Sequence, residues 1–123
     1  MNLALSNLIG LGVFTGVLAV GQLLFKKAGL SIRGLSLTEG LLSLAQSPAL
    51  YAAIALYALS TLLWVWLLSR VTLMQAYPWI AVGVIIVPLL SAAVFGERVN
   101  STYWLGALLI VAGILVTQYS ALE

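Results

Sequence analysis

Gln22 and Lys26 are the two residues of this sequence whose spacing most directly suggests binding chemistry. They are four residues apart in an apolar segment, so a helix places both side chains on one face. An amide donor and an ammonium near a membrane surface could together hold a phosphate group, with Lys27, Arg33 and Arg98 as further cations. The alternative for Lys26 and Lys27 is that both ammonium groups only reach for water and set the topology.

A second polar group begins a later apolar segment, where Gln75 and Tyr77 precede Pro78. Pro78 and Pro88 each remove a backbone donor, so we expect this helix to bend and to leave carbonyl groups free. Tyr77 and Gln75 would bring hydrogen bonds to a cavity beside those carbonyls. The alternative for Tyr77 is a place in the aromatic belt at the membrane surface. Trp64, in the preceding apolar segment, is a candidate to line the same pathway.

The sequence lacks several groups that catalysis and proton transport need. It contains no His and no Cys, and its three acidic residues are Glu39, Glu97 and Glu123. All three map to connectors or to a chain end, so no apolar segment carries the titratable group that proton antiport requires. No nucleophile–base pair or metal-ligand set can be assembled, so we expect neither an enzyme nor a bound cofactor or metal. The net charge of +2 is dispersed and gives no footprint for nucleic acid.

The composition indicates which elements must position these residues. Of 123 residues, 63% are hydrophobic and 7% are charged, whereas a soluble domain carries about 25% charged residues. Four apolar runs, approximately residues 3–25, 49–69, 71–95 and 102–119, are each long enough for a membrane-spanning helix of about 20 residues. Backbone polar groups must be satisfied internally in lipid. We therefore predict an all-α integral membrane protein, with a single domain of four transmembrane helices over residues 1–123.

Residues 28–46 form the one long connector, between the first and second spans. Within it, Ser36 and Glu39 have the spacing of a capping box and precede several leucines. This pattern predicts a short amphipathic helix over Leu37–Gln46 that lies in the membrane interface. The alternative is an early extension of the second span, against which Pro48 favours a break.

The basic residues near the ends of the spans predict the orientation of the chain. Lys26, Lys27, Arg33 and Arg98 fall on one side of the membrane, and Arg70 falls on the other. Because basic residues favour the cytoplasmic side, we expect loops one and three in the cytoplasm and both termini outside.

Gly106 and Gly113 are seven residues apart in the last span, so they lie on one stripe of that helix and predict a packing surface. This stripe completes a series of motifs that resembles the small multidrug resistance branch of the drug/metabolite transporter superfamily. The other motifs are Gly21 followed five residues later by Lys26, Gln75 to Trp79, and Phe95 to Arg98. The resemblance implies a four-helix membrane protein that works as a dimer, with Gly106 and Gly113 in the dimer interface.

Members of that branch that exchange protons for drugs carry a Glu three residues before the glycine that matches Gly21, and this chain has Leu18 there. A closer resemblance is to the subunits of the undecaprenyl-phosphate aminoarabinose flippase, through Gly21-Gln22, Lys26 and Ala76-Tyr77-Pro78. It implies that a small homo- or heterodimer moves a lipid-linked sugar phosphate across the bacterial inner membrane.

The expected function is a flippase that moves a polyprenyl-phosphate-linked sugar between leaflets without a proton-coupling carboxylate in the membrane. Lys26, helped by Gln22, is expected to hold the phosphate, with Arg98 in reserve. The candidates for sugar contacts are Tyr77, Gln75 and Trp64. Two alternatives stay open: an exporter of small metabolites or amphipathic cations, and a non-transporting membrane subunit of a larger glycolipid-modifying complex.

Overall fold

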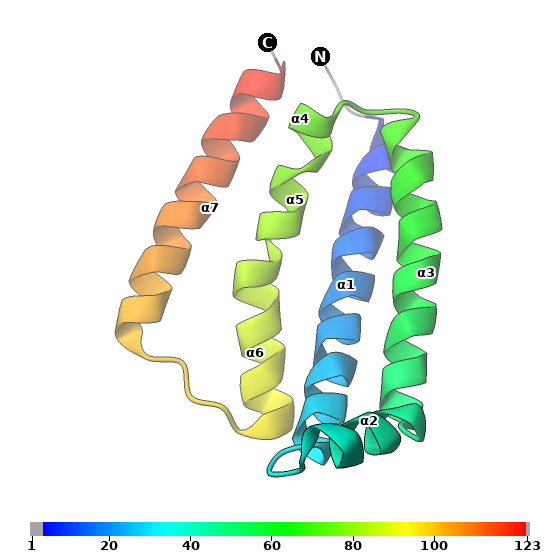
Figure 1. Ribbon diagram of the computed structural model, residues 1–123. Helices are drawn as coiled ribbons and strands as arrows, with labels where there is room; N and C mark the ends of the chain where they lie inside the picture. The colour runs from blue at the N-terminus through cyan, green and yellow to red at the C-terminus, as the bar shows by residue number, and fades with distance from the viewer. Residues whose placement is uncertain (1–3, 123) are drawn as a thin grey trace.

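The computed structural model describes residues 4–122, and all of its regular elements are helices (Figure 1). They are α1 (Leu5–Ser31), α2 (Leu37–Ala45), α3 (Pro48–Leu68), α4 (Leu73–Ala76), α5 (Pro78–Ala81), α6 (Gly83–Phe95) and α7 (Ser101–Leu122). Four segments are long and apolar enough to cross a membrane: α1, α3, the run Leu73–Phe95, and α7. The predicted fold class is therefore confirmed. Leu3, in the first predicted span, and Glu123 lie outside the described residues.

The four spans lie side by side and run along the long dimension of the molecule (Figure 1). α1 packs mainly against α3, and on another side it contacts α5 and α6. α7 is outermost and contacts α4 and α5. α2 lies across the end of the bundle at which α1 ends and α3 begins, while α1 begins and α7 ends at the opposite end (Figure 1).

The core between α1 and α3 is small, and most large apolar side chains face outward. Its buried members include Leu11, Phe14 and Leu67, with the Trp64 ring stacked on Phe14 at a centroid separation of 4.7 Å. By contrast, outward-facing residues such as Leu62 are 68% exposed. An outward surface of this kind would be costly in water and is suited to lipid.

α1 continues six residues past the predicted end of the first span, to Ser31. Lys26 and Lys27 end the hydrophobic run, but lysine is a good helix former and nothing in the next four residues breaks the helix. The turn comes later, where Gly34 adopts a positive φ of 81°. The predicted connector of residues 28–46 is therefore partly helix α1.

The helix predicted inside the connector is α2, and its capping box is present. The Ser36 hydroxyl oxygen accepts a hydrogen bond from the Glu39 N–H, and the Glu39 carboxylate accepts one from the Ser36 N–H. Ser47 caps the start of α3 by accepting from the Leu50 N–H, so α2 and α3 are separate helices, as Pro48 indicated.

The third span is broken into α4, α5 and α6, and α7 supplies hydrogen bonds to the broken segment. Pro78 begins α5, and Pro88 lies inside α6, where it cannot donate to the carbonyl of Val84. That carbonyl accepts instead from the Tyr103 hydroxyl at 2.7 Å. Beside the break between α4 and α5, the Gln75 carbonyl accepts from the Gln118 side chain at 3.1 Å. Two polar side chains of α7 thus satisfy carbonyls next to the two bends.

Candidate functional site

Lys26 lies at the α2 end of the bundle and forms an ion pair with Glu97, at 3.0 Å between Nζ and Oε1. Glu97 belongs to the loop after α6, which begins at Gly96 with a positive φ of 69°. Both side chains are partly open, at 40% and 44% exposure. An ion pair this exposed contributes little to stability, so another anion can replace the carboxylate at little cost.

The loop carboxylate is held in its charged form by two donors. The Ser91 hydroxyl donates to Glu97 Oε2 at 2.5 Å, and Lys26 contacts the other oxygen. The hydrogen bond from Ser91, followed by that from Lys26, holds the pKa of Glu97 below its ordinary value. At neutral pH the end of the bundle therefore presents a cation beside an ionised carboxylate.

Gln22 lies one turn further into the bundle, where its side chain donates to the hydroxyl of Tyr57 on α3. Although Gln22 and Lys26 are four residues apart, they reach different neighbours: α3 for the amide, and the loop after α6 for the ammonium. Tyr57 also packs edge-on against Phe25, with ring centroids 5.0 Å apart. Its ring lies so close to α1 that a Cβ on Gly21 would be 2.5 Å from the Tyr57 Cε1 atom. Gly21 therefore makes room for the tyrosine that binds Gln22.

A cavity of about 450 Å³ lies between α1, α3, α5, α6 and α7. Its polar side chains are those of Thr15, Gln22, Tyr57 and Tyr103. The other lining residues are apolar or glycine: Leu18, Ala19, Ile80, Gly83, Val84, Val87 and Pro88. The cavity can offer hydroxyl and amide groups to a polar guest.

Leu18, at the position that the predicted resemblance aligns with a Glu of proton-exchanging proteins, lines this cavity. Over the described part of the chain, no carboxylate belongs to the lining. The polar groups that line the cavity are therefore hydroxyls and one amide.

Tyr57, Tyr103 and Thr15 were not predicted as site residues. Tyr57 and Tyr103 lie in or at the start of apolar helices, where a tyrosine is a common surface residue, so their type alone gives no signal. Thr15 donates to the Leu11 carbonyl of its own helix and to the Trp79 carbonyl of α5. Gly21 was the available signal for Tyr57, since glycine next to a polar residue in a membrane helix often marks a close approach.

Gln75 belongs to α4 and Tyr77 links α4 to α5, and α4 lies at the end of the bundle opposite α2 (Figure 1). The Gln75 side chain is buried and completes a capping box with Thr72. Tyr77 is 63% exposed and lines an apolar hollow of about 590 Å³, together with Pro78 and Gly113. The predicted sugar contacts Gln75 and Tyr77 thus lie at the end of the bundle opposite to Gln22 and Lys26, which were predicted to hold the phosphate.

The remaining predicted site residues occupy separate places. Trp64 packs in the core against Phe14, and Arg98 is an exposed residue next to Glu97. Gly106 and Gly113 lie on the outermost helix, where an added Cβ would meet no atom within 4 Å. Their stripe is open within this chain, and its role as a dimer interface stays a prediction.

These features describe a small all-helical protein with four segments able to cross a membrane, a neutral polar cavity between them and a cation at one end. No family model and no solved structure matches the chain. Curated relatives do match it, and three of them carry the name "Probable 4-amino-4-deoxy-L-arabinose-phosphoundecaprenol flippase subunit ArnE".

The three relatives come from Aeromonas hydrophila, Pseudomonas aeruginosa and Pectobacterium atrosepticum. The first is 35% identical over 71 residues, which is 58% of this chain and 62% of the relative. The second is 38% identical over 76 residues, which is 62% of this chain and 66% of the relative. The third is 39% identical over 69 residues, which is 56% of this chain and 61% of the relative. The matched part of this chain spans less than two thirds of each relative. These relatives confirm the predicted resemblance to the aminoarabinose flippase subunits, whereas the wider likeness to the small multidrug resistance branch stays a prediction.

Proposed function

We propose that this protein is a subunit of a flippase that moves a polyprenyl-phosphate-linked sugar between the leaflets of a bacterial inner membrane. The observation that supports this most is the position of Lys26, whose exposed ammonium lies one turn from a neutral polar cavity. The names of the relatives support the same class of substrate.

The substrate has three parts with different needs. Its phosphate diester carries a negative charge, which the Lys26 ammonium can bind by exchanging the Glu97 carboxylate for a phosphate oxygen. The sugar presents hydroxyl groups, for which Gln22 and Tyr57 form a ready donor–acceptor pair. The polyprenyl tail can stay in lipid, because the outer faces of the helices are apolar. The sugar thus crosses in the cavity while the tail remains outside it.

The driving force follows from the charges along this path. The cavity lining carries no carboxylate in the described residues, so no carboxylate there can take up and release a coupling proton. We therefore propose facilitated movement down the concentration gradient of the lipid-linked sugar, maintained by an enzyme that consumes it on the far side.

The proposed assembly is a homo- or heterodimer. The stripe of Gly106 and Gly113 on α7, where an added Cβ would meet no atom within 4 Å, offers a surface for a second subunit. The proposed orientation places α2 and the loop containing Glu97 in the cytoplasm, because Lys26, Lys27, Arg33 and Arg98 gather at that end.

The test is transbilayer movement of a short-chain polyprenyl-phosphate sugar in proteoliposomes that contain the protein with any co-purifying subunit. We expect Lys26→Ala to reduce the initial rate at least tenfold, because a charge-assisted contact to phosphate contributes about 1.5–3 kcal/mol. Arg70→Ala is the matched control, since it also removes one cation but lies at the opposite end, over the Trp66 ring. Equal rates for Lys26→Ala and the unchanged protein would refute the proposed site. Movement of a soluble cation in place of the lipid would favour the exporter alternative.

A further inference from the structure

A second polar hollow lies where α1, α2 and α3 meet, and the proposed flipping path does not use it. Its volume is about 590 Å³. Lys27 lines it from α1, whereas the neighbouring Lys26 turns to the loop after α6. The polar residues of the lining are Lys27, Ser31, Ser43, Gln46 and Ser47, and the apolar ones are Leu24, Pro48, Ala49 and Ala52.

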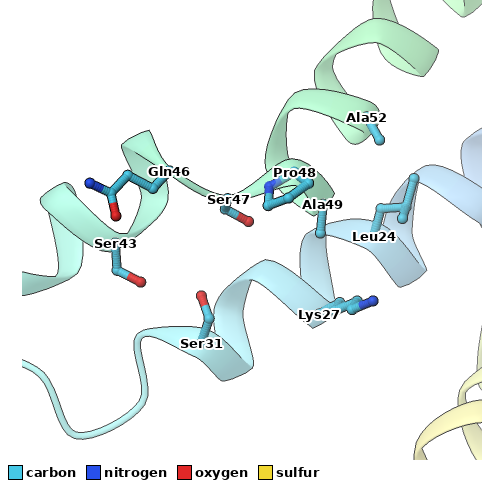
Figure 2. Close-up of a pocket in the computed structure, with 9 residues that line it drawn as sticks. All are labelled: Leu24, Lys27, Ser31, Ser43, Gln46, Ser47, Pro48, Ala49 and Ala52. Atoms are coloured by element: carbon cyan, nitrogen blue, oxygen red, sulfur yellow. The ribbon is translucent and has the colours of Figure 1, made fainter.

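The lining changes from polar to apolar along the bundle. Figure 2 shows the hydroxyl groups of Ser31 and Ser43 facing the same space beside α2, whereas Leu24 and Ala52 lie further into the bundle. The order from polar to apolar matches that of a lipid in a leaflet, which has a polar headgroup followed by apolar chains. A soluble polar ligand would have no apolar group to place against Leu24 and Ala52.

The hollow presents hydrogen-bond donors and a cation without a competing carboxylate. Lys27 is exposed and forms no ion pair with any residue from 4 to 122. Ser47 is nearly fully buried and accepts from the Leu50 N–H, so its O–H remains a donor. The Ser31 hydroxyl already donates its hydrogen bond to the Ala28 carbonyl, so it lines the hollow without offering a donor to a ligand. The lining residues include no acid, so the charge suits an anion.

From this arrangement we infer that the hollow under α2 binds the phosphate headgroup of an anionic membrane phospholipid. The Lys27 ammonium contacts the phosphate, the hydroxyls of Ser43 and Ser47 donate to it, and the acyl chains follow the groove past Leu24 and Ala52. The bound lipid joins α2 to the ends of α1 and α3, because α2 itself packs only lightly on α1. Leu37, Leu41 and Leu42 of α2 are exposed and suit the same interface.

The experiment is native mass spectrometry of the detergent-purified protein, titrated with dioctanoyl phosphatidylglycerol. We expect one saturable lipid per chain, with binding weakened about tenfold in Lys27→Ala and about threefold in Ser43→Ala. Arg70→Ala is the matched control, because it also removes one cation but lies at the opposite end of the bundle, over the Trp66 ring, and its affinity should stay within about twofold of the unchanged protein. Lys27 and Ser43 pack in no core cluster, and circular dichroism would verify that the variants keep their helices.

Two further arms identify the source of the phosphate. Dioctanoyl phosphatidylcholine, whose headgroup has no net charge, should bind more weakly, and its affinity should not depend on Lys27. Glycerol 3-phosphate, which has no chains, should bind at least tenfold more weakly than the lipid. Equal binding of phosphatidylglycerol by Lys27→Ala and the unchanged protein would overturn the inference, as would glycerol 3-phosphate binding as tightly as the lipid. None of these results depends on whether the protein flips a sugar lipid.

Discussion

Replacing Gly21 with alanine tests how the polar cavity is built. The new Cβ would lie 2.5 Å from Cε1 and 2.9 Å from Cδ1 of Tyr57, and both atoms belong to a rigid ring. The ring must therefore move away from α1, which separates its hydroxyl from the Gln22 amide.

The size of the effect follows from three contributions. Overpacking a tight contact costs roughly 1–3 kcal/mol, and a lost hydrogen bond between membrane helices costs about 0.6–2 kcal/mol. Alanine in place of a helical glycine returns about 1 kcal/mol. We therefore expect Gly21→Ala to lower the free energy of unfolding by about 0.6–4 kcal/mol. Gly12→Ala, where a Cβ would meet no atom within 4 Å, should leave it unchanged or raise it by up to about 1 kcal/mol.

The assay is reversible unfolding in mixed micelles, followed by helical circular dichroism, as a double-mutant cycle with Tyr57→Ala. Because the clash needs the ring, Gly21→Ala should become neutral or stabilising in the Tyr57→Ala background, with a coupling energy above about 1 kcal/mol. If Gly21→Ala proves as stable as Gly12→Ala, the close approach of Tyr57 to α1 is wrong.

Three more predictions concern other parts of the molecule. Tyr103→Phe should destabilise the protein by about 0.5–1.5 kcal/mol, because the Val84 carbonyl loses its hydrogen bond. The cost should be smaller in a Pro88→Ala background, where the new backbone N–H can donate to the same carbonyl. Additive effects of the two substitutions in unfolding titrations would argue against this. Because the pKa of Glu97 is lowered in the folded protein, the stability that its ionised form contributes should be present at neutral pH and lost as the pH falls through that lowered pKa. Melting temperatures from pH 7 to 3 should show this loss relative to Glu97→Gln, and parallel curves would exclude it. With no native cysteine in the sequence, Leu35→Cys should react with an impermeant maleimide only from the cytoplasmic side and Ser69→Cys only from outside; the reverse labelling would invert the proposed orientation.

The helices could be predicted because their signals are local. Long apolar runs, the Ser36–Glu39 capping box and the break at Pro48 each depend on a few neighbouring residues, and the structure contains all of them. The end of α1 differed because Lys26 and Lys27 mark where the hydrophobic run stops, which is a property of the membrane and not of the helix. Asn100 caps the start of α7 in the same local way, since its side chain accepts a hydrogen bond from the Tyr103 N–H.

The candidate site was less accessible to prediction because it depends on which helices meet. The four-residue spacing indicated a shared helix face for Gln22 and Lys26, but it could not show that Tyr57 on α3 binds one and Glu97 the other. The position of Gln75 near Pro78 suggested a cavity, but it could not show that the Gln75 side chain caps its own helix. Contacts of this kind link residues that are far apart in the sequence, so only the packing of the helices defines them.

The most direct test of the central proposal is whether the phosphate of the sugar lipid contacts Lys26. The chain contains two lysines, Lys26 and Lys27, so a sample labelled with ¹⁵N at lysine Nζ gives two signals that Lys27→Ala assigns. In bilayers of a phosphorus-free glycolipid, a polyprenyl-phosphate sugar supplies the only ³¹P nuclei, and ¹⁵N–³¹P dephasing in solid-state NMR reports their distance from each lysine. The account predicts dephasing of the Lys26 signal on addition of the sugar lipid. A Lys26 signal that stays unchanged, with the sugar lipid bound, would contradict it.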